Sequence, residues 1–210
     1  MSQFLATISR LRWIQRWSLK RNTLNENVME HSWEVAVIAH LLGVINNTVY
    51  GGQLNAYRLA TLALYHDAAE SITGDLPTPV KYYSPEIQKA YKTIEEDAEQ
   101  ALLAMLPKQL QASMTTMIGE PSDWQEGKYL KAADSLSAYL KAKAEVANGN
   151  QEYQHTLEDL AHKIASYQLP EVDYFLKELT AEHQASELGA SNGYGKRAAQ
   201  QVYGLIANRT

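Results

Sequence analysis

The chain has 210 residues, of which 45% are hydrophobic and 20% charged, and this composition is typical of a compact folded domain rather than of a disordered or fibrous chain. Its formal net charge of −5 argues against a surface built for nucleic acids or anionic membranes, because neutralising phosphates requires an excess of Lys and Arg. The absence of cysteine excludes disulfides and thiolate zinc sites, and it leaves His, Asp and Glu as the candidate metal ligands.

No membrane segment and no export signal are expected from the sequence. Charged residues interrupt each apolar run before it reaches the roughly 20 residues that a membrane span needs. The segment 1–17 spaces apolar residues like a helix but has neither a continuous apolar stretch nor a small-residue cleavage site. We therefore expect a cytoplasmic protein without a membrane partner.

Apolar residues recur at helical spacing along the chain, and no convincing strand pattern is present. The predicted helices cover about residues 4–17, 28–45, 55–74, 85–106, 107–117, 122–147, 151–167 and 170–188. This pattern predicts an all-α helical bundle.

Caps and prolines locate the ends of several predicted helices. Asn55 and Ser84 are good N-caps, and Ser122 with Gln125 resembles a capping box. The segment 75–79 contains two prolines, so it is expected to form a stiff loop after the third helix. Loops of this kind often line functional sites.

The chain is expected to form one domain over residues 1–188. The following segment, 189–210, begins with small and polar residues and is predicted to be a loosely attached tail with no assigned function.

The densest group of ionisable side chains lies in the sequence YHDAAE, residues 65–70. On one helix, Glu70 shares a face with Asp67 and His66, which lie three and four residues before it. The adjacent His66 and Asp67 point about 100° apart, so both can approach one ion. The same pattern also fits a solvated His–Glu pair that stabilises the helix by only a few tenths of a kcal/mol.

Two more candidate ligands lie elsewhere in the chain. His31 is near the start of the predicted helix 28–45, and Asp134 lies among small and apolar residues of the helix 122–147. A carboxylate that faces inward is costly unless it is paired or binds metal, which favours Asp134 as a ligand. A core histidine and an exposed aspartate are the alternatives.

Arg16 and Trp17 are expected at the end of the first helix. They fit a solvated cation and a core indole, or a pair that contacts a substrate.

The order of His31, the pair His66-Asp67, and Asp134 resembles the HD-domain metallophosphohydrolase superfamily. The resemblance extends over about residues 3–180 and is closest to the bacterial HD-domain 5'-deoxynucleotidases of the YfbR type. It is carried by Arg16-Trp17, ENVMEHS (26–32), YHDAAESITGDLPTPVKYY (65–83) and KAADSLSAYLK (131–141). The stretch TGDLPTPVK is more specific than the His-Asp pair, which many phosphohydrolases share.

The resemblance implies an HD-domain helical bundle that binds one divalent transition metal. The implied metal ligands are His31, His66, Asp67 and Asp134, and Glu70 is the implied catalytic carboxylate. Imidazoles with carboxylates suit Mn²⁺, Co²⁺, Ni²⁺, Fe²⁺ or Zn²⁺ better than Mg²⁺. Family behaviour favours Co²⁺ or Mn²⁺, with Cu²⁺ as a further candidate.

The resemblance also implies where a nucleotide binds. Arg16 orients the phosphate and acts in catalysis, while Trp17 packs against the sugar. The loop of Asp75, Leu76, Pro77 and Thr78 contacts the nucleoside. Lys81 is a further phosphate contact, and the ligands His31 and Asp67 also face the substrate.

We therefore expect hydrolysis of 2'-deoxyribonucleoside 5'-monophosphates to a deoxynucleoside and phosphate, by a homodimer. One alternative is a deoxynucleoside triphosphate triphosphohydrolase of the same superfamily. The other is a non-catalytic helical module that binds nucleotides. Whether Glu70 acts as a base or as an acid is open from the sequence.

Overall fold

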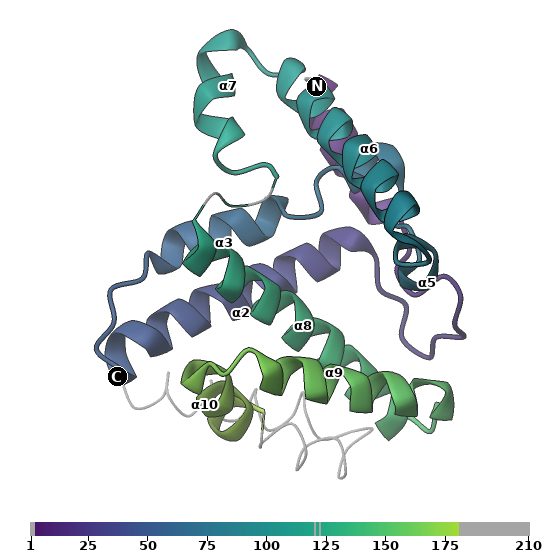
Figure 1. Cartoon of the computed structure of the whole chain (residues 1–210), viewed down its shortest axis with the longest axis vertical. Coiled ribbons are helices and arrows are strands. Elements are labelled where there is room, and N and C mark those ends of the chain that lie inside the picture. The colour runs from purple at the N-terminus through teal and green to yellow at the C-terminus, as the bar shows by residue number, and fades with distance from the viewer. Residues whose placement is uncertain (1–2, 120, 122, 181–210) are drawn as a thin grey trace, which may run out of the picture. The chain divides into compact units, whose positions relative to one another are not determined.

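Helices make up the regular structure of the described residues (Figure 1). The structure is a computed structural model and describes residues 3–119, 121 and 123–180. Within these residues the helices are α1 (Gln3–Ile8), η1 (Ser9–Trp13), α2 (Val28–Val49), α3 (Ala56–Tyr65), α4 (Glu70–Thr73), α5 (Thr78–Lys81), α6 (Pro85–Ala104), α7 (Lys108–Thr115), α8 (Trp124–Ala147), η2 (Gln151–Tyr153), α9 (Gln154–Ser166) and α10 (Pro170–Leu179). The predicted all-α fold is confirmed.

Helix α2 lies at the centre of the fold and packs against η1, α3 and α8 (Figure 1). Its buried positions include 28, 35 and 42, seven residues apart, and 31, 38 and 45 at the same interval, which together form one stripe of the helix. The stripe is apolar except for His31. Gly43 lets α2 and α3 approach closely, because a Cβ there would lie 2.8 Å from the Cα of Ala56.

By length and composition, α2 is apolar enough to cross a membrane. Its most apolar window has a mean hydropathy of 1.3, although no membrane span is expected from the sequence. However, 56% of that window is buried inside the protein, and neighbouring helices cover it. Core helices of folded domains have the same composition, so packing accounts for the apolar character of α2.

The first predicted helix is wrong at its C-terminal end. The chain leaves the helical conformation at Ile14 and forms an isolated antiparallel bridge between Gln15 and Asn27. Arg16 and Trp17 therefore lie beyond η1, directly after the bridged residue Gln15 and beside the start of α2. This pairing joins residues twelve apart in sequence, so a local pattern of apolar residues does not reveal it.

The third predicted helix is interrupted. Helix α3 ends at Tyr65, a turn covers residues 66–69, and α4 then ends before Gly74, which has a positive φ of 76°. The predicted proline loop is also shorter than expected, because Pro79 lies in the first turn of α5. A proline is tolerated there since its missing N–H would have no partner in the helix.

Most of the later helices lie where the sequence predicts them. The N-cap of α6 is Ser84 as predicted, with its Oγ 3.3 Å from the backbone nitrogen of Ile87. The N-cap of α8 is Asp123, which accepts from the backbone nitrogen of Gln125 at 2.7 Å. The predicted cap Ser122 lies outside the described residues.

Two units emerge from the contacts within the chain, residues 1–169 and 170–210. In the second unit the described part ends at residue 180, just after α10. The predicted last turns of that helix and the predicted tail, 189–210, lie outside the described residues. The division into residues 1–188 and 189–210 remains a prediction.

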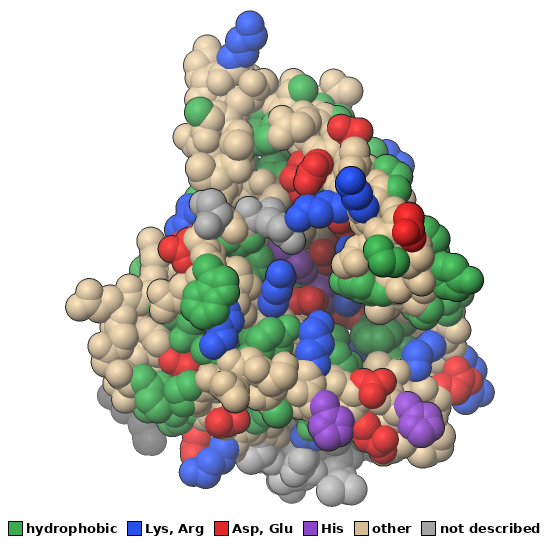
Figure 2. Space-filling model, viewed as in Figure 1, with side chains coloured by type: hydrophobic (Ala, Val, Ile, Leu, Met, Phe, Trp, Pro, Cys, Tyr) green, Lys and Arg blue, Asp and Glu red, His purple; other side chains and the backbone are tan. Residues whose placement is uncertain are grey.

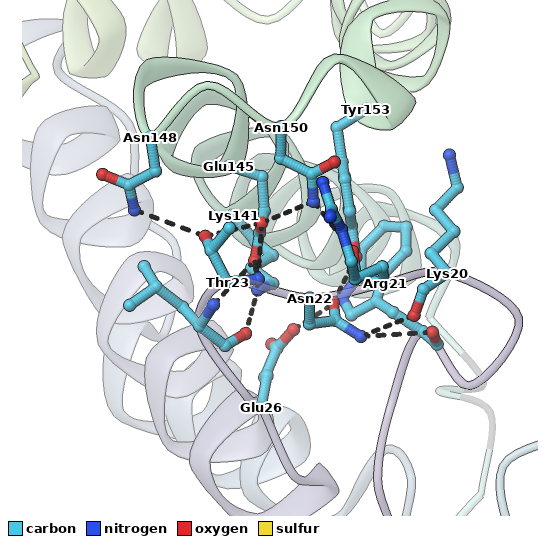
Figure 3. A network of polar contacts seen from close by, with 12 residues as sticks. Lys20, Arg21, Asn22, Thr23, Glu26, Lys141, Glu145, Asn148, Asn150 and Tyr153 are labelled. Atoms are coloured by element: carbon cyan, nitrogen blue, oxygen red, sulfur yellow. Dashed lines mark hydrogen bonds and ion pairs between the residues drawn. The ribbon is translucent and has the colours of Figure 1, made fainter.

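A buried carboxylate ties the loop before α2 to the C-terminal end of α8 (Figure 3). Glu145 is fully buried and accepts hydrogen bonds from the backbone nitrogens of Thr23, at 2.9 Å, and Leu24, at 3.0 Å. Lys141 forms an ion pair with the same carboxylate, and Asn150 donates to it at 2.8 Å. The loop is therefore held by charge-assisted hydrogen bonds, which are stronger than neutral ones.

These donors determine the ionisation of Glu145. Burial alone raises the pKa of this carboxyl, but hydrogen bonds from Lys141, Asn150 and the loop backbone outweigh burial and hold the pKa well below the usual range. The charged form is therefore the form that stabilises the fold.

We predict that Glu145→Gln lowers the free energy of unfolding at pH 7 by about 3–5 kcal/mol, because it breaks a buried ion pair. Since the folded pKa is depressed, this stabilisation is present above the unfolded pKa of about 4.3 and is lost as the pH falls through the folded value. The difference between wild type and variant in urea unfolding should therefore narrow as the pH falls below about 4. The exposed Glu158→Gln is the control and should change stability by less than about 0.5 kcal/mol. A constant difference from pH 7 to pH 3 would contradict this account.

Candidate metal and active site

Three predicted ligands meet inside the first unit. Donor atoms of His31, His66 and Asp134 all lie within 4.8 Å of one another. They come from α2, from the turn after α3 and from α8, and these three helices pack together. The capping box of Asn27 and Glu30 fixes where α2 begins, which places His31 in the first turns of that helix.

Asp67 lies beside this group. Its Oδ2 is 3.1 Å from Nε2 of His66 and 3.6 Å from Nε2 of His31. Arg16 approaches the same oxygen, with Nη1 at 3.5 Å. The structure therefore brings together the four residues expected as ligands and the arginine expected at the phosphate.

Hydrogen bonds on the far side of each imidazole determine which nitrogen faces the cluster. Nδ1 of His66 lies 2.7 Å from the carbonyl oxygen of Ala63, which only accepts, so Nδ1 carries the proton. Nδ1 of His31 lies 3.3 Å from Oε1 of Glu26 and 3.2 Å from Oγ of Ser137. Both rings thus present Nε2 to the carboxylates of Asp67 and Asp134.

The cluster fits a divalent metal. Nε2 of His31 and Nε2 of His66 are buried, and each lies 3.1 Å from a carboxylate oxygen, that of Asp134 and that of Asp67 respectively. Two imidazole nitrogens that face two carboxylates form a donor set that suits divalent transition metals.

The charges around His31 affect its own titration and that of its neighbours. Burial lowers the pKa of His31, but hydrogen bonds with Asp134 and Glu26 outweigh burial and raise this pKa to about 9. Burial raises the pKa of Asp134, whereas the contact with His31 lowers it to about 2. For Asp67, the two histidines and Arg16 overcome burial and hold the pKa well below the usual range. A metal ion that binds Nε2 of His31 would therefore displace a proton from this ring.

Glu70 differs from the other acidic groups in the site. Its Oε2 is buried and has no hydrogen-bond partner in the described part of the chain, and burial together with the negative charges of Asp67 and Asp75 raises its pKa well above the usual range. It is not one of the three residues whose donor atoms meet within 4.8 Å. A carboxyl group that holds its proton in a site of this kind can serve in proton transfer.

Glu26 is a site residue that sequence reasoning missed. Its Oε2 accepts from Nε1 of Trp17 at 2.6 Å, while its Oε1 lies 3.7 Å from Nε of Arg16. The bridge between Gln15 and Asn27 creates these contacts, and no local pattern signals it. Glu26 is the first residue of the family-like motif ENVMEHS, but the motif alone does not indicate a role for it.

The predicted site residues after α4, at positions 75–78 and 81, differ in burial and in their contacts. Asp75 interacts electrostatically with Arg16 and Asp67, and burial raises its pKa. Lys81 donates to Glu95 of α6 at 2.8 Å, so its charge is already paired. The other predicted loop contacts are half-buried at positions 76 and 77 and exposed at Thr78.

The face of the protein shown in Figure 2 contains a hollow. Histidine and acidic side chains are visible inside it, and Lys and Arg side chains lie around its opening (Figure 2). Cationic side chains at such an opening raise the local concentration of anionic ligands.

The sequence of the chain matches a known protein family. The model of the family "5'-deoxynucleotidase YfbR-like" matches residues 3–183. A 5'-deoxynucleotidase of Vibrio vulnificus is 46% identical over 186 residues, which are 88% of this chain and 96% of the relative. A 5'-deoxynucleotidase of Yersinia pseudotuberculosis is 50% identical over 177 residues, 84% of this chain and 90% of the relative.

Among solved structures, an HD-domain phosphohydrolase from Listeria innocua superposes with a TM-score of 0.76 at 26% identity. The superposition covers 99% of this chain and 98% of the other. The resemblance noted in the sequence is therefore confirmed. The chain belongs to the YfbR-like 5'-deoxynucleotidase family of HD-domain proteins.

Proposed function

We propose that the protein is a metal-dependent phosphomonoesterase that hydrolyses 2'-deoxyribonucleoside 5'-monophosphates to a deoxynucleoside and phosphate. The observation that carries the proposal is the cluster of buried His31 with half-buried His66 and Asp134, which has Asp67 and Arg16 beside it. Membership of a family whose curated relatives are named 5'-deoxynucleotidases supports the same reaction.

We infer that His31, His66, Asp67 and Asp134 hold one divalent transition metal. Two imidazole nitrogens favour Mn²⁺ or Co²⁺ over Mg²⁺, which prefers oxygen ligands, and Cu²⁺, Ni²⁺, Fe²⁺ and Zn²⁺ suit the same donors. When bound, such an ion supplies Lewis-acid chemistry, which neutralises phosphate charge and acidifies water.

Arg16 is placed to bind and orient the phosphate. Its side chain is only 14% exposed and is held between Asp67 and Glu26, so the guanidinium is oriented before a substrate arrives. Guanidinium groups match the geometry of phosphate oxygens, and a fixed guanidinium loses little entropy on binding. Lys81 is a weaker candidate for a second phosphate contact because Glu95 already pairs with it.

Glu70 moves the proton in this proposal. Burial and the charges of Asp67 and Asp75 favour the protonated form of Glu70, and this proton can be given to the 5'-oxygen as the bond from that oxygen to phosphorus breaks. The attacking water adds to phosphorus and returns a proton to Glu70. The products are a neutral deoxynucleoside and phosphate, and Glu70 ends as it began.

The sugar is proposed to lie between Trp17 and the segment from Asp75 to Thr78. Asp75 can accept a hydrogen bond from the 3'-hydroxyl, which both sugars carry. Leu76 and Pro77 are half-buried and provide apolar surface next to it. Selectivity for deoxyribose is then assigned to the flat indole of Trp17, which offers no partner to a 2'-hydroxyl.

We also propose a cytoplasmic homodimer without nucleic-acid or membrane partners. The net charge of −5 supports the absence of nucleic-acid binding. Exposed apolar side chains on α2 and α3, including Trp33 and Tyr57, support a protein interface, since monomers rarely expose such groups together.

We predict that a divalent cation such as Mn²⁺ stabilises the chelator-treated protein. At about one hundred times the dissociation constant the stabilisation is about 2.7 kcal/mol, which raises the melting temperature by about 5–10 °C. Asp134→Asn should lose this shift because it removes a ligand, whereas Glu70→Gln should keep it. The affinity should increase from pH 6 to pH 9, since His31 must lose its proton. Calorimetry with metal analysis measures both effects, and a shift that survives in Asp134→Asn would contradict the ligand assignment.

We predict that the manganese-loaded protein releases phosphate from dAMP roughly tenfold to a hundredfold faster than from AMP, since an unpaired 2'-hydroxyl costs about 1–3 kcal/mol. Trp17→Ala should reduce this preference. The control is Trp124→Ala, which removes a tryptophan that is 78% exposed and lies at the start of α8. Measurements of kcat/KM, together with identification of the products of dATP, test the proposal. Equal rates for dAMP and AMP would refute it, and release of tripolyphosphate from dATP would favour a triphosphohydrolase.

A further inference from the structure

One carboxylate, that of Glu26, contacts three side chains with different proposed tasks. Its Oε2 accepts the indole N–H of Trp17 at 2.6 Å. Its Oε1 lies 3.3 Å from Nδ1 of His31 and 3.7 Å from Nε of Arg16. The side chain of Glu26 is only 11% exposed, so water offers little competition for these donors.

The backbone of Glu26 adds a further contact to the same segment. Its carbonyl oxygen accepts from the backbone nitrogen of Arg16 at 3.0 Å, next to the bridge between Gln15 and Asn27. Glu26 therefore fixes the segment that carries Arg16 and Trp17 through its main chain and its side chain together.

Trp17 has an unusual backbone conformation. Its φ of 58° lies in the left-handed region, which costs a non-glycine residue free energy and persists only where surrounding contacts enforce it. The indole donates a hydrogen bond to Glu26, its ring centroid lies 5.4 Å from that of Tyr153, and the guanidinium carbon of Arg16 lies 6.0 Å from the ring centroid. A strained residue with a fixed side chain is typical of a functional position.

We propose that Glu26 is a positioning residue that sets the selectivity for deoxyribose. It does so by holding the indole of Trp17 in a fixed position relative to His31 and Arg16. The inference rests on the proposed function. An indole that is fixed in place rejects a 2'-hydroxyl because it leaves that group without a partner. An indole that can tilt admits water or the hydroxyl, and the discrimination is lost.

The chemistry of the carboxylate explains why this position needs glutamate. A carboxylate accepts hydrogen bonds on both oxygens, and here the donors of Trp17 lie on one side and those of Arg16 and His31 on the other. Glutamine has the same size but only one acceptor, so its amide N–H₂ must face a donor on one of the two sides.

The test measures kcat and KM for dAMP and AMP in the manganese-loaded wild type, Glu26→Gln, Trp17→Phe and the double variant. Changes that act through His31 or Arg16 affect both sugars alike, because metal and phosphate are common to both. The ratio of the two kcat/KM values therefore reports on Trp17 alone. Trp17→Phe keeps a flat ring and removes the indole N–H, so it tests the same link without altering the carboxylate.

We expect Glu26→Gln and Trp17→Phe each to lower the ratio of kcat/KM for dAMP to kcat/KM for AMP. The decrease should be roughly tenfold if the wild-type ratio is about one hundred. The double variant should have the ratio of Trp17→Phe, because the two changes remove one interaction. The control is Glu30→Gln, an exposed carboxylate four residues away whose capping contact with Asn27 a glutamine can also make. It should leave both rates unchanged.

Two outcomes would overturn the inference alone. In the first, the wild type prefers dAMP, but Glu26→Gln lowers kcat/KM for dAMP and for AMP by the same factor. In the second, Trp17→Phe keeps the full ratio. Equal rates in the wild type would instead refute the proposed function, and the inference with it.

Discussion

Three carboxylates surround the buried imidazole of His31, and this concentration of negative charge is the constraint on which the rest of the site depends. Asp134 and Asp67 lie 3.1 Å and 3.6 Å from Nε2, and Glu26 lies 3.3 Å from Nδ1. Like charges in a poorly hydrated interior repel strongly unless cations balance them. Arg16 supplies one positive charge, and a proton on His31 or a divalent cation supplies the rest. The affinity for metal follows from this shortage of positive charge.

The fold holds these charges together from two directions. Packing of α2 against α3 and α8 brings His31, the turn after α3 and Asp134 to one place. The segment that carries Arg16 and Trp17 is held at one end by the pairing of Gln15 with Asn27, and the loop that follows it is held by Glu145 (Figure 3). A buried carboxylate thus anchors the loop remote from the cluster, while Glu26 anchors it next to the cluster. Stability and site geometry depend on the same loop.

The sequence predicts the parts of this arrangement that are local. Helical spacing places His31 on the buried stripe of α2, and apolar neighbours indicate that Asp134 is costly to bury without a partner. The role of Glu26 is not visible in the sequence because it arises from an isolated bridge that interrupts the expected first helix. Nor does helical spacing describe the turn between α3 and α4, where the contacts of His66 and Asp67 depend on tertiary packing.

The central claim is that a single divalent cation balances the charge of this cluster. Crystals of the manganese-loaded protein, measured with anomalous diffraction, test it most directly. The account predicts one strong anomalous peak, with Nε2 of His31, Nε2 of His66 and carboxylate oxygens of Asp67 and Asp134 as its protein ligands, and with Glu70 outside the coordination shell. A peak elsewhere, the absence of a peak at saturating metal, or direct coordination by Glu70 would contradict it.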